Sequence, residues 1–483
     1  MSRILAGPFN RVEGDLQVTL DIQSDQVASA QVNSPLFRGF ERIMLGHDPM
    51  DALVYTPRIC GICSVSQSVA CARALGDMME LDIPENGLHA TNLVLANENM
   101  TDLLTHFYLF FMPDFARDHY QSEDWFAPVQ SRFKATQGSA TRAMLPARAD
   151  FLHLMGIMAG KWPHTLSLQP GGTTKPIEAS ERVRLLAILG GFRRFLETEL
   201  FGDNLDVIAS LASVSDLTAW QAEKDWNSSD FRRFLHISDS LALTELGEGT
   251  QQFVSYGAYL QPNGKVFNDG VFVQGQRAQL DTSLITEDHS HAWMNAPLAR
   301  LHPREGVTEP IADESAGYSW CKAPRLDGQV VEVGSLARQF INQHPLALDL
   351  VATAGANVHS RIVARLLELA LIIPKMQAWA KAIDPAAPFC AHGQLPDQGR
   401  GVGLIEAARG SLGHWLEVDK GKIKNYQIVA PTTWNFSPRD EQNQPGVLEQ
   451  ALVGAPVKEG EKTPLSVQHI VRSFDPCMAC TVH

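Results

Sequence analysis

Two short stretches, one near each end of the chain, each contain a pair of cysteines: Arg58-Ile59-Cys60-Gly61-Ile62-Cys63 and Asp475-Pro476-Cys477-Met478-Ala479-Cys480-Thr481-Val482-His483. Two residues separate the cysteines of each pair, a spacing that lets both sulfurs bind one metal. We expect a helix after Cys63, capped by Ser64. The N-terminus of this helix and the nearby Arg58 would favour thiolates at the first pair. A site built from both pairs requires the ends of the chain to meet, so residues 1–483 are expected to form one unit.

The identity of the metal does not follow from these ligands alone. The two pairs of a structural zinc site usually lie roughly 15–20 residues apart. Residues 64–476 separate the pairs in this chain, which disfavours zinc. A thioredoxin-like redox motif would explain one pair but not the second. Soft thiolates suit nickel, iron or an iron–sulfur cluster, and ligand chemistry leaves these three open.

Composition restricts the class of protein. Of 483 residues, 45% are hydrophobic and 19% charged, as in ordinary globular proteins. The 40 Lys and Arg against 54 Asp and Glu give a net charge of −14, which argues against nucleic-acid binding. No signal-peptide run opens the chain, and seven cysteines, an odd number, favour reduced thiols. Arg365 and Glu368 interrupt the most apolar stretch, residues 362–373. We therefore expect a cytoplasmic protein without direct membrane insertion.

The spacing of apolar residues predicts a mainly helical protein with α+β additions. Helical spacing recurs in four segments, which we expect to form a central bundle of long helices: residues 64–79, 89–111, 177–202 and 360–382.

Three further regions are expected around this bundle. Residues 11–32 alternate apolar and polar side chains, which predicts a β-hairpin in an N-terminal β region over residues 1–35. Residues 225–330 mix short apolar runs with Gly, Asn and Pro and predict a peripheral α/β section. Residues 435–462 predict a long surface loop leading to a C-terminal metal-binding segment over residues 463–483.

The residues around the cysteine pairs closely resemble the two signatures of the [NiFe]-hydrogenase large subunit. Further family-like motifs follow in the family's order: Arg11-Val12-Glu13-Gly14, Phe37-Arg38-Gly39-Phe40-Glu41, Pro113-Asp114-Phe115, Pro170-Gly171-Gly172, residues 406–415 and residues 426–435. The resemblance covers essentially the whole chain and implies that subunit's fold. It also implies a nickel–iron centre whose iron carries carbon monoxide and cyanide. Cys63 and Cys480 would bridge the metals, with Cys60 and Cys477 terminal on nickel.

This resemblance implies an enzyme that cleaves H2 into protons and electrons. Heterolytic cleavage needs a Lewis acid and a nearby base, which nickel and a terminal thiolate supply. Cys477 is the expected first proton acceptor, and Glu13 is the next residue on the proton route. The alternative role for Glu13 is a salt bridge to Arg11.

Further polar residues are expected around the metals by the same resemblance. Arg409 would lie over their open side, near the cyanides, where it orients gas or acts as a base. Asp114 would pair with Arg409 and hold it in position; a helix cap beside Pro113 is the alternative. Thr432 resembles the residue that hydrogen-bonds a cyanide nitrogen, although Thr433 is chemically equal.

A magnesium-type site is implied by Glu41, the backbone carbonyl of Ile428 and His483. Carboxylate and carbonyl oxygens suit a hard cation such as Mg²⁺, and a bound His483 would anchor Cys480. The alternative is that His483 frays into solvent. The other cysteines are expected in the core: Cys71, Cys321 and Cys390. Three histidines in family-like segments are expected to form hydrogen bonds only: His106, His164 and His414.

Three of the departures from the common family pattern bear on the branch of the family. Gln67 replaces a histidine usually found four residues after the second cysteine, and an amide, unlike an imidazole, cannot change charge near neutral pH. Ile62 and Phe110 stand where Val and Leu are common, and their bulk would narrow the tunnel through which gas reaches nickel. Together with Gln67 beside the centre, they resemble the regulatory, hydrogen-sensing branch, whose members are typically cytoplasmic and slow. The chain end at His483 points the same way.

The first hypothesis is therefore the large subunit of a slow, oxygen-tolerant hydrogen sensor that signals to a histidine kinase. It requires a small subunit with iron–sulfur clusters, forming a heterodimer or a dimer of heterodimers, because this chain has no cysteines left for an electron relay. An energy-conserving uptake hydrogenase is the alternative. A metal-free structural relative from a respiratory complex is a third hypothesis, against which the four cysteines argue.

Overall fold

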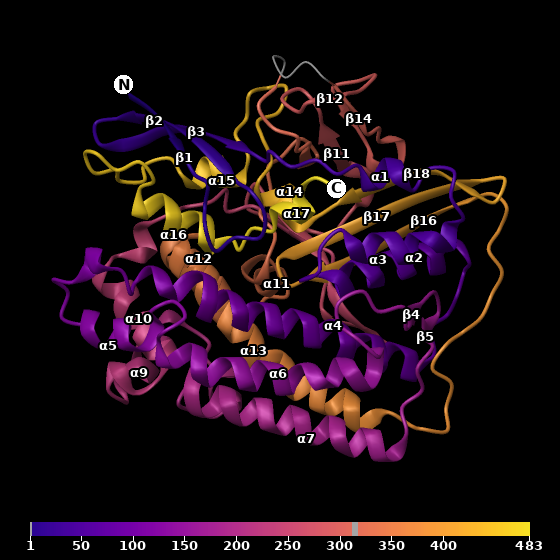
Figure 1. The fold of residues 1–483 in the computed structure, drawn as a ribbon, viewed down its shortest axis with the longest axis horizontal. Helices are drawn as coiled ribbons and strands as arrows, with labels where there is room; N and C mark the ends of the chain where they lie inside the picture. The colour runs from indigo at the N-terminus through magenta and orange to yellow at the C-terminus, as the bar shows by residue number, and fades with distance from the viewer. Residues whose placement is uncertain (1, 312–316) are drawn as a thin grey trace.

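The computed structural model describes residues 2–311 and 317–483. Long helices fill the lower half of the molecule in Figure 1, and small sheets cover their upper end. The helices are α1 (Phe40–Ile43), α2 (Ala52–Tyr55), α3 (Ser64–Met78), α4 (Glu85–Thr105), α5 (Phe126–Phe133), α6 (Ser139–Ala159), α7 (Ala179–Phe195), α8 (Leu205–Ala209), α9 (Val214–Ala222), α10 (Asp230–Ser240), α11 (Ser335–Ile341), α12 (Pro345–Ala354), α13 (Val358–Ala382), α14 (Pro431–Asn435), α15 (Val447–Ala451), α16 (Leu465–Ser473) and α17 (Met478–Thr481).

The strands are mostly short. They are β1 (Ser2–Ala6), β2 (Gln17–Gln23), β3 (Gln26–Asn33), β4 (Leu168–Gln169), β5 (Gly172–Thr173), β6 (Phe253–Ser255), β7 (Ala258–Gln261), β8 (Gly264–Phe267), β9 (Gly270–Val273), β10 (Gln276–Ala278), β11 (Ile285–Asp288), β12 (Met294–Asn295), β13 (Arg300–Leu301), β14 (Glu309–Pro310), β15 (Ala323–Leu326), β16 (Gly399–Ala407), β17 (Gly410–Asp419) and β18 (Lys422–Val429). The predicted fold class, mainly helical with α+β additions, is confirmed.

Helices α4 and α13 pack against each other at the centre of the bundle. Almost every residue of α4 after its first turn is buried, as its apolar circumference predicts, and the helix continues into a π-helical turn over His106–Phe111. Helix α13 begins where the Asn357 side chain accepts a hydrogen bond from the Ser360 backbone N–H at 2.9 Å. Helices α6 and α7 pack alongside. Helix α6 was not predicted.

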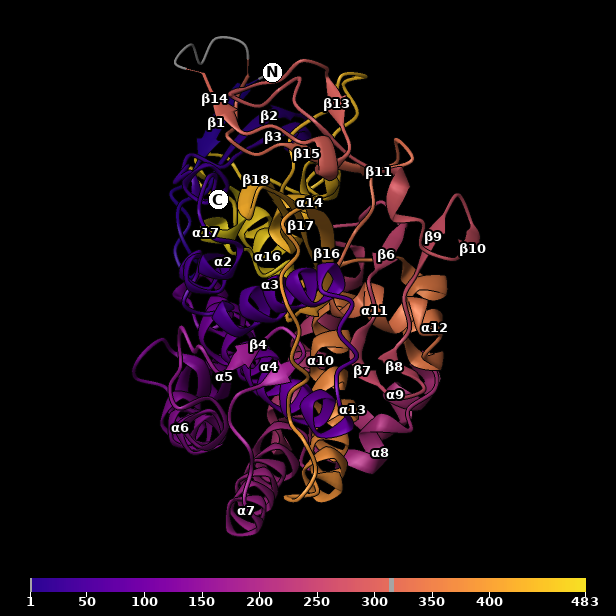
Figure 2. The same ribbon diagram turned by 90° about the vertical axis from the view of Figure 1, so that its right-hand side faces the viewer.

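The N-terminal sheet contains the predicted hairpin. Strands β2 and β3 pair antiparallel, with Ser24 and Asp25 in left-handed conformations at the turn. Strand β1, which was not predicted, adds to the edge of β2. Residues 225–330 contain α10 and short strands, the α/β mixture that was predicted. Figure 2 shows the N-terminal sheet and the β9–β10 hairpin on opposite sides of the molecule.

A further three-stranded sheet, in the order β16-β17-β18, was missed by the sequence analysis. It packs on α3 so closely that a Cβ atom on Gly401 would lie 1.9 Å from the Ala74 carbonyl oxygen. A Cβ on Gly403 would lie 1.9 Å from the Ala70 carbonyl oxygen, so both positions require glycine. The sheet leads through α14 into the C-terminal part of the chain.

The predicted surface loop over residues 435–462 is wrong for much of its length. Residues 436–438 and Asp440 are buried, and α15 lies against the N-terminal sheet. There the Glu449 carboxylate accepts a hydrogen bond from the Val32 backbone N–H at 2.9 Å. Within residues 2–311 and 317–483, none of the helices has the length and apolarity to cross a bilayer.

Candidate metal centre

The four cysteines of the two C-x-x-C pairs meet in the interior. Cys60 and Cys63 lie in the turn before α3, Cys477 directly precedes α17, and Cys480 lies within α17. Their sulfur atoms all lie within 4.8 Å of one another, and all four residues are buried. The Cys63–Cys480 and Cys477–Cys480 sulfur distances are 3.0 Å, and the Cys60–Cys477 distance is 3.4 Å. The thiols are free, and four convergent sulfurs fit a soft metal ion.

Backbone hydrogen bonds attach the N-terminal segment to the second cysteine pair. The Met478 N–H donates to the Glu13 carbonyl at 2.6 Å, and the Glu13 N–H donates to the Pro476 carbonyl at 3.4 Å. Gly14, at φ +81°, allows this contact, since a Cβ there would lie 3.1 Å from the Ala479 nitrogen. Glu13 therefore lies beside Cys477.

One guanidinium connects the two pairs directly. Arg38 precedes α1, and its Nη2 donates to the carbonyl oxygens of Ile59 and Ala479, each at 2.5 Å. These carbonyls belong to the residues immediately before Cys60 and Cys480. The sequence analysis quoted Arg38 in a motif but gave it no role.

The start of α3 is capped by a residue from another helix. The Glu98 carboxylate, on α4, accepts the backbone N–H groups of Val65 and Ser66 at 2.8 and 2.9 Å. Ser64 was the predicted cap, but its hydroxyl instead donates to Glu98 at 3.3 Å. Burial raises the pKa of Glu98 to about 7, although the Val65 N–H and the Trp162 indole oppose the rise.

Arg409 lies in the turn between β16 and β17 and is buried. Its Nη1 and Nη2 donate to the two carboxylate oxygens of Asp102, on α4, at 2.5 and 3.2 Å. Its Nη2 also donates to Asp475 Oδ1 at 3.1 Å. Burial alone would lower the pKa of Arg409, but Asp102 and Asp475 outweigh it and hold the pKa well above its usual value. Arg409 is thus a fixed cation, which favours the predicted orienting role over the predicted base.

Arg338, on α11, is hydrogen-bonded to the turn that carries Arg409. Arg338 donates to the carbonyl oxygens of Ala407 and Ala408 at 2.8 and 3.0 Å. It also pairs with Glu368 at 2.9 Å and with Glu406 at 2.8 Å. All three side chains are buried, so this network fixes the backbone directly before Arg409.

The predicted pairing of Asp114 with Arg409 is wrong. Asp114 is fully buried and pairs with Arg11, with Arg472 at 2.5 Å and with Arg117 at 3.1 Å. The helix-cap alternative is also wrong, because Asp114 is the last residue of a 3₁₀ turn. Burial would raise the pKa of Asp114, but His469, Arg472 and Arg11 hold it well below its usual value. Asp114 fixes the segment that precedes Glu13.

The Glu13 side chain is half-buried. The alternative of a salt bridge to Arg11 is wrong, because Arg11 pairs with Asp114. Burial, followed by the charge of Cys60, raises the pKa of Glu13 against Arg409 and Arg38. These influences place the carboxyl group in the electrostatic field of the cysteine cluster.

The structure distinguishes the two adjacent threonines. Thr433 donates its hydroxyl proton to the Thr481 carbonyl at 2.9 Å. Thr432 Oγ1 instead accepts the Cys477 backbone N–H at 3.1 Å, and within the described residues its own proton has no acceptor. Thr432 is therefore the threonine with a hydroxyl proton free beside Cys477, where the sequence analysis placed the cyanide-binding hydroxyl.

Gln67 contacts His414 one turn into α3. Gln67 Oε1 accepts a hydrogen bond from His414 Nε2 at 2.8 Å, and His414 Nδ1 accepts one from the Tyr426 hydroxyl at 2.8 Å. All three side chains are buried. Burial, reinforced by His483, lowers the pKa of His414 to about 3. Gln67 was predicted to lie beside the metal centre. In this structure its side-chain amide is hydrogen-bonded to a neutral imidazole, that of His414.

The residues of the expected magnesium-type site also come together. His483 Nε2 lies 2.6 Å from the Ile428 carbonyl oxygen and 3.4 Å from Glu41 Oε1. Lys322 lies 3.8 Å from the other Glu41 oxygen. Burial would raise the pKa of Glu41, but Lys322, His483 and Thr308 lower it to about 2. His483 is 4% exposed, so the fraying alternative is wrong. A carboxylate, a carbonyl and an imidazole fit a divalent cation.

Comparison with known proteins identifies the family. A family model described as nickel-dependent hydrogenase matches residues 38–122 and 142–483. The chain belongs to the nickel-dependent hydrogenase family. The large subunit of the periplasmic [NiFeSe] hydrogenase of Desulfomicrobium baculatum is 29% identical over 524 residues, covering 100% of this chain and 95% of that protein. The hydrogenase-2 large chain of Escherichia coli K12 is 28% identical over 566 residues, covering 100% and 97%.

A solved hydrogenase structure has the same fold. The Ni-Fe-Se hydrogenase of Desulfovibrio vulgaris Hildenborough in the reduced state gives a TM-score of 0.84 at 27% identity, with both chains fully covered. The predicted family, subunit and enzyme class are confirmed: the chain is a hydrogenase large subunit. The sensing branch stays a prediction.

The remaining predicted residues of this hydrogenase are two side chains assigned to gas access and three single cysteines. Ile62 packs on the core next to Cys63 and is partly exposed, as is Phe110 in the π-helical turn after α4. Their role in gas access stays a prediction. Cys71 and Cys321 are buried as expected, while Cys390 is only half-buried.

The family-like histidines make the expected hydrogen bonds. His106 Nε2 lies 2.6 Å from the Arg472 carbonyl oxygen, and His164 Nδ1 lies 2.9 Å from the Pro57 carbonyl oxygen. His414 bonds to Gln67 and Tyr426 as described above.

The buried neutral His414 predicts acid-sensitive folding of the hydrogenase. The pKa of His414 is about 3 in the folded protein, against about 6.5 in the unfolded chain. The contribution of the neutral imidazole to the free energy of unfolding is therefore complete above pH 6.5 and is lost as the pH falls toward 3. We expect the free energy of unfolding to fall by roughly 2 kcal/mol between about pH 6.5 and about pH 5. Urea denaturation at several pH values measures this loss. His414→Gln, which cannot titrate, should show a shallower dependence; an equal slope would contradict the assignment.

Proposed function

We propose that this hydrogenase large subunit splits H2 heterolytically at a nickel–iron centre held by Cys60, Cys63, Cys477 and Cys480. The observation that carries the proposal is the convergence of four buried sulfurs within 4.8 Å. When bound, such a centre supplies a Lewis acid that polarises the H–H bond. Carbon monoxide and cyanide on the iron belong to this proposal, and the free Thr432 hydroxyl proton supports a cyanide partner there.

The chain's own residues then move the proton. The Cys477 thiolate takes the proton at Sγ, and the Glu13 carboxylate receives it next. Two facts support this order: the Glu13 backbone is hydrogen-bonded to Pro476 and Met478, on both sides of Cys477, and the pKa of Glu13 is raised. Arg409, fixed as a cation by Asp102 and Asp475, orients the reacting gas and excludes water from the open side.

Infrared spectroscopy and metal analysis of the purified protein test the centre. We expect nickel in the preparation and infrared bands of carbon monoxide and cyanide bound to iron. Absence of both signals from correctly folded protein would end the hydrogenase proposal and leave the metal-free structural role.

Glu13→Gln should block proton transfer while the metals stay bound. An amide of the same size cannot accept the proton, and we expect hydrogen–deuterium exchange to fall by roughly 100-fold or more. Isotope exchange in the gas phase measures the rate, and nickel content is the control. Normal exchange would remove Glu13 from the route.

We further propose that the large subunit acts in a cytoplasmic hydrogen sensor, with Mg²⁺ or a similar cation at Glu41, Ile428 and His483. The combination of Gln67, Ile62 and Phe110 supports the sensing branch. Seven free cysteines are compatible with a reducing compartment. In this proposal a small subunit with iron–sulfur clusters carries the electrons, in a heterodimer or a dimer of heterodimers, and a histidine kinase receives the signal. Co-purification with either protein tests the partners.

The double variant Ile62→Val and Phe110→Leu should become more sensitive to oxygen. Both changes remove bulk at positions predicted to narrow the gas tunnel, so oxygen should reach the centre several-fold faster. The measurement is the rate at which hydrogen oxidation is lost under oxygen, with the wild-type complex as control. Unchanged inactivation would show that these side chains do not gate gas.

An uptake hydrogenase is the second candidate. It is favoured by relatives such as the uptake hydrogenase large subunit of Rhizobium leguminosarum bv. viciae, which is 29% identical over 573 residues, covering 100% of this chain and 95% of that protein. Rapid hydrogen oxidation that oxygen destroys would support uptake; slow turnover that survives oxygen would support sensing.

A further inference from the structure

Arg73, on α3, is a partly buried cation without an acidic partner. Its Nη1 donates to the Leu404 carbonyl oxygen at 3.0 Å. Among the described residues, Nε and Nη2 make no hydrogen bond, and the guanidinium makes no ion pair. Asp77, one turn further along α3, instead accepts the Val402 backbone N–H at 2.9 Å. Burial lowers the pKa of Arg73 to about 10, with no acid to offset it.

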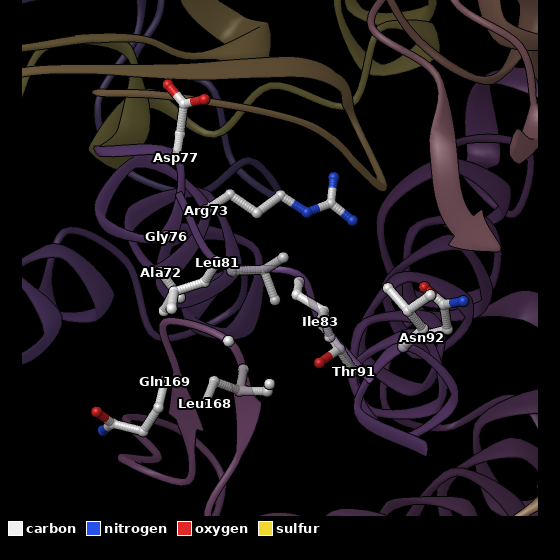
Figure 3. Close-up of a pocket in the computed structure, with 14 residues that line it drawn as sticks. Ala72, Arg73, Gly76, Asp77, Leu81, Ile83, Thr91, Asn92, Leu168 and Gln169 are labelled. Carbon is white, nitrogen blue, oxygen red and sulfur yellow. The ribbon is translucent and has the colours of Figure 1, made fainter. Parts of the chain in front are cut away.

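Arg73 lines a cavity of about 90 Å³ between α3, α4 and the β4–β5 hairpin. Its walls include the aliphatic side chains of Leu81, Ile83 and Leu168. Figure 3 shows these side chains together. Asp77 also lines the cavity, and its carboxylate and the Arg73 guanidinium extend from α3 in different directions. The space is large enough for several water molecules or one small organic molecule.

A second polar group lines the same space. The Thr91 side chain, on α4, is partly exposed, and no hydrogen bond uses its hydroxyl within the part of the chain that the structure describes. The floor of the cavity is rigid, because Gly171 accepts the Ala391 N–H at 2.9 Å. A Cβ on Gly171 would lie 2.3 Å from the Ala391 carbonyl oxygen, which shows how closely the hairpin is held. The cavity is thus preformed.

We propose that this cavity binds a short aliphatic monocarboxylate. The Nε and Nη2 atoms form the edge of a guanidinium that matches the two oxygens of a carboxylate, and both are free on Arg73. The Thr91 hydroxyl supplies a further donor, and the aliphatic walls enclose the hydrocarbon tail. Binding neutralises a cation that otherwise stays uncompensated. This site is separate from the cysteine cluster and does not depend on hydrogen chemistry.

Calorimetric titration of the complete hydrogenase with propionate tests the site, with propionamide as the neutral control. We expect propionate to bind and propionamide to bind at least tenfold more weakly. Arg73→Gln should weaken propionate binding at least tenfold, and Thr91→Val should weaken it several-fold. Arg400→Gln removes the same charge from an exposed position on β16 and should leave binding unchanged.

Two further results separate this site from simpler explanations. Leu81→Trp keeps the cation but fills the space, so it should abolish binding even if Arg73→Gln does not fold. Equal propionate binding by wild type, Arg73→Gln and Leu81→Trp would overturn the proposal, as would absence of binding to wild type. Chloride that competes as strongly as propionate would overturn the carboxylate class.

Discussion

Asp102→Asn is expected to lower hydrogen oxidation per nickel by roughly 10- to 100-fold, the usual effect of removing a partner that orients a group at a metal site. The two Asp102 oxygens accept Nη1 and Nη2 of Arg409. An asparagine amide offers one acceptor oxygen and no charge, so Arg409 loses both its geometry and its main counter-ion. Hydrogen-dependent dye reduction, normalised to nickel content, measures the effect.

Asp114→Asn is the matched control for this prediction. Asp114 is fully buried among Arg11, Arg117 and Arg472, so its neutralisation leaves guanidinium charges uncompensated. We expect a loss of about 3–5 kcal/mol in the free energy of unfolding, measured by denaturation. The protein that remains folded should lose much less activity per nickel than Asp102→Asn does. If Asp114→Asn lowered that activity and Asp102→Asn did not, the assignment of Arg409's partner would be wrong.

The error over these two aspartates shows what sequence reasoning lacked. Both lie in one continuous helical region, twelve positions apart. The π-helical turn at His106–Phe111 changes the helical period between them, so regular spacing could not tell which face Asp114 occupies. A usable signal was present: Glu98 and Asp102 lie four residues apart in a helix otherwise predicted to be buried. Buried carboxylates need partners, and that requirement pointed to Asp102.

The parts predicted correctly from sequence depend on local patterns. Patterns among neighbouring residues were enough to predict the cysteine pairs, the β2–β3 hairpin and the helices α3, α4, α7 and α13. The sheet β16-β17-β18 was missed because glycines such as Gly401 and Gly403 weaken a strand pattern, whereas here they permit close packing on α3. The need for glycine depends on a helix more than 300 residues earlier, and no local pattern contains that information.

Arg38→Met should cause the largest loss of the metal centre itself among changes outside the four cysteines. One Arg38 nitrogen bonds the carbonyls of Ile59 and Ala479, so a single side chain sets the spacing between the two cysteine pairs. Two hydrogen bonds from a charged donor contribute about 3 kcal/mol or more. Their loss should weaken the association of the two cysteine segments by roughly 100-fold. We therefore expect purified Arg38→Met to contain less than half the wild-type nickel, measured by elemental analysis.

Hydrogen exchange at the backbone separates this role from general destabilisation. Exchange in Arg38→Met should rise in the segments around Cys60 and Cys480 but not in α13, because the clamp connects only the cysteine segments. Arg42→Met provides the matched control, since Arg42 lies on α1 with the same charge but is exposed. It should retain nickel and normal exchange. Full nickel content with unchanged exchange in Arg38→Met would show that the metal alone draws the two ends of the chain together, and that the guanidinium follows rather than sets their spacing.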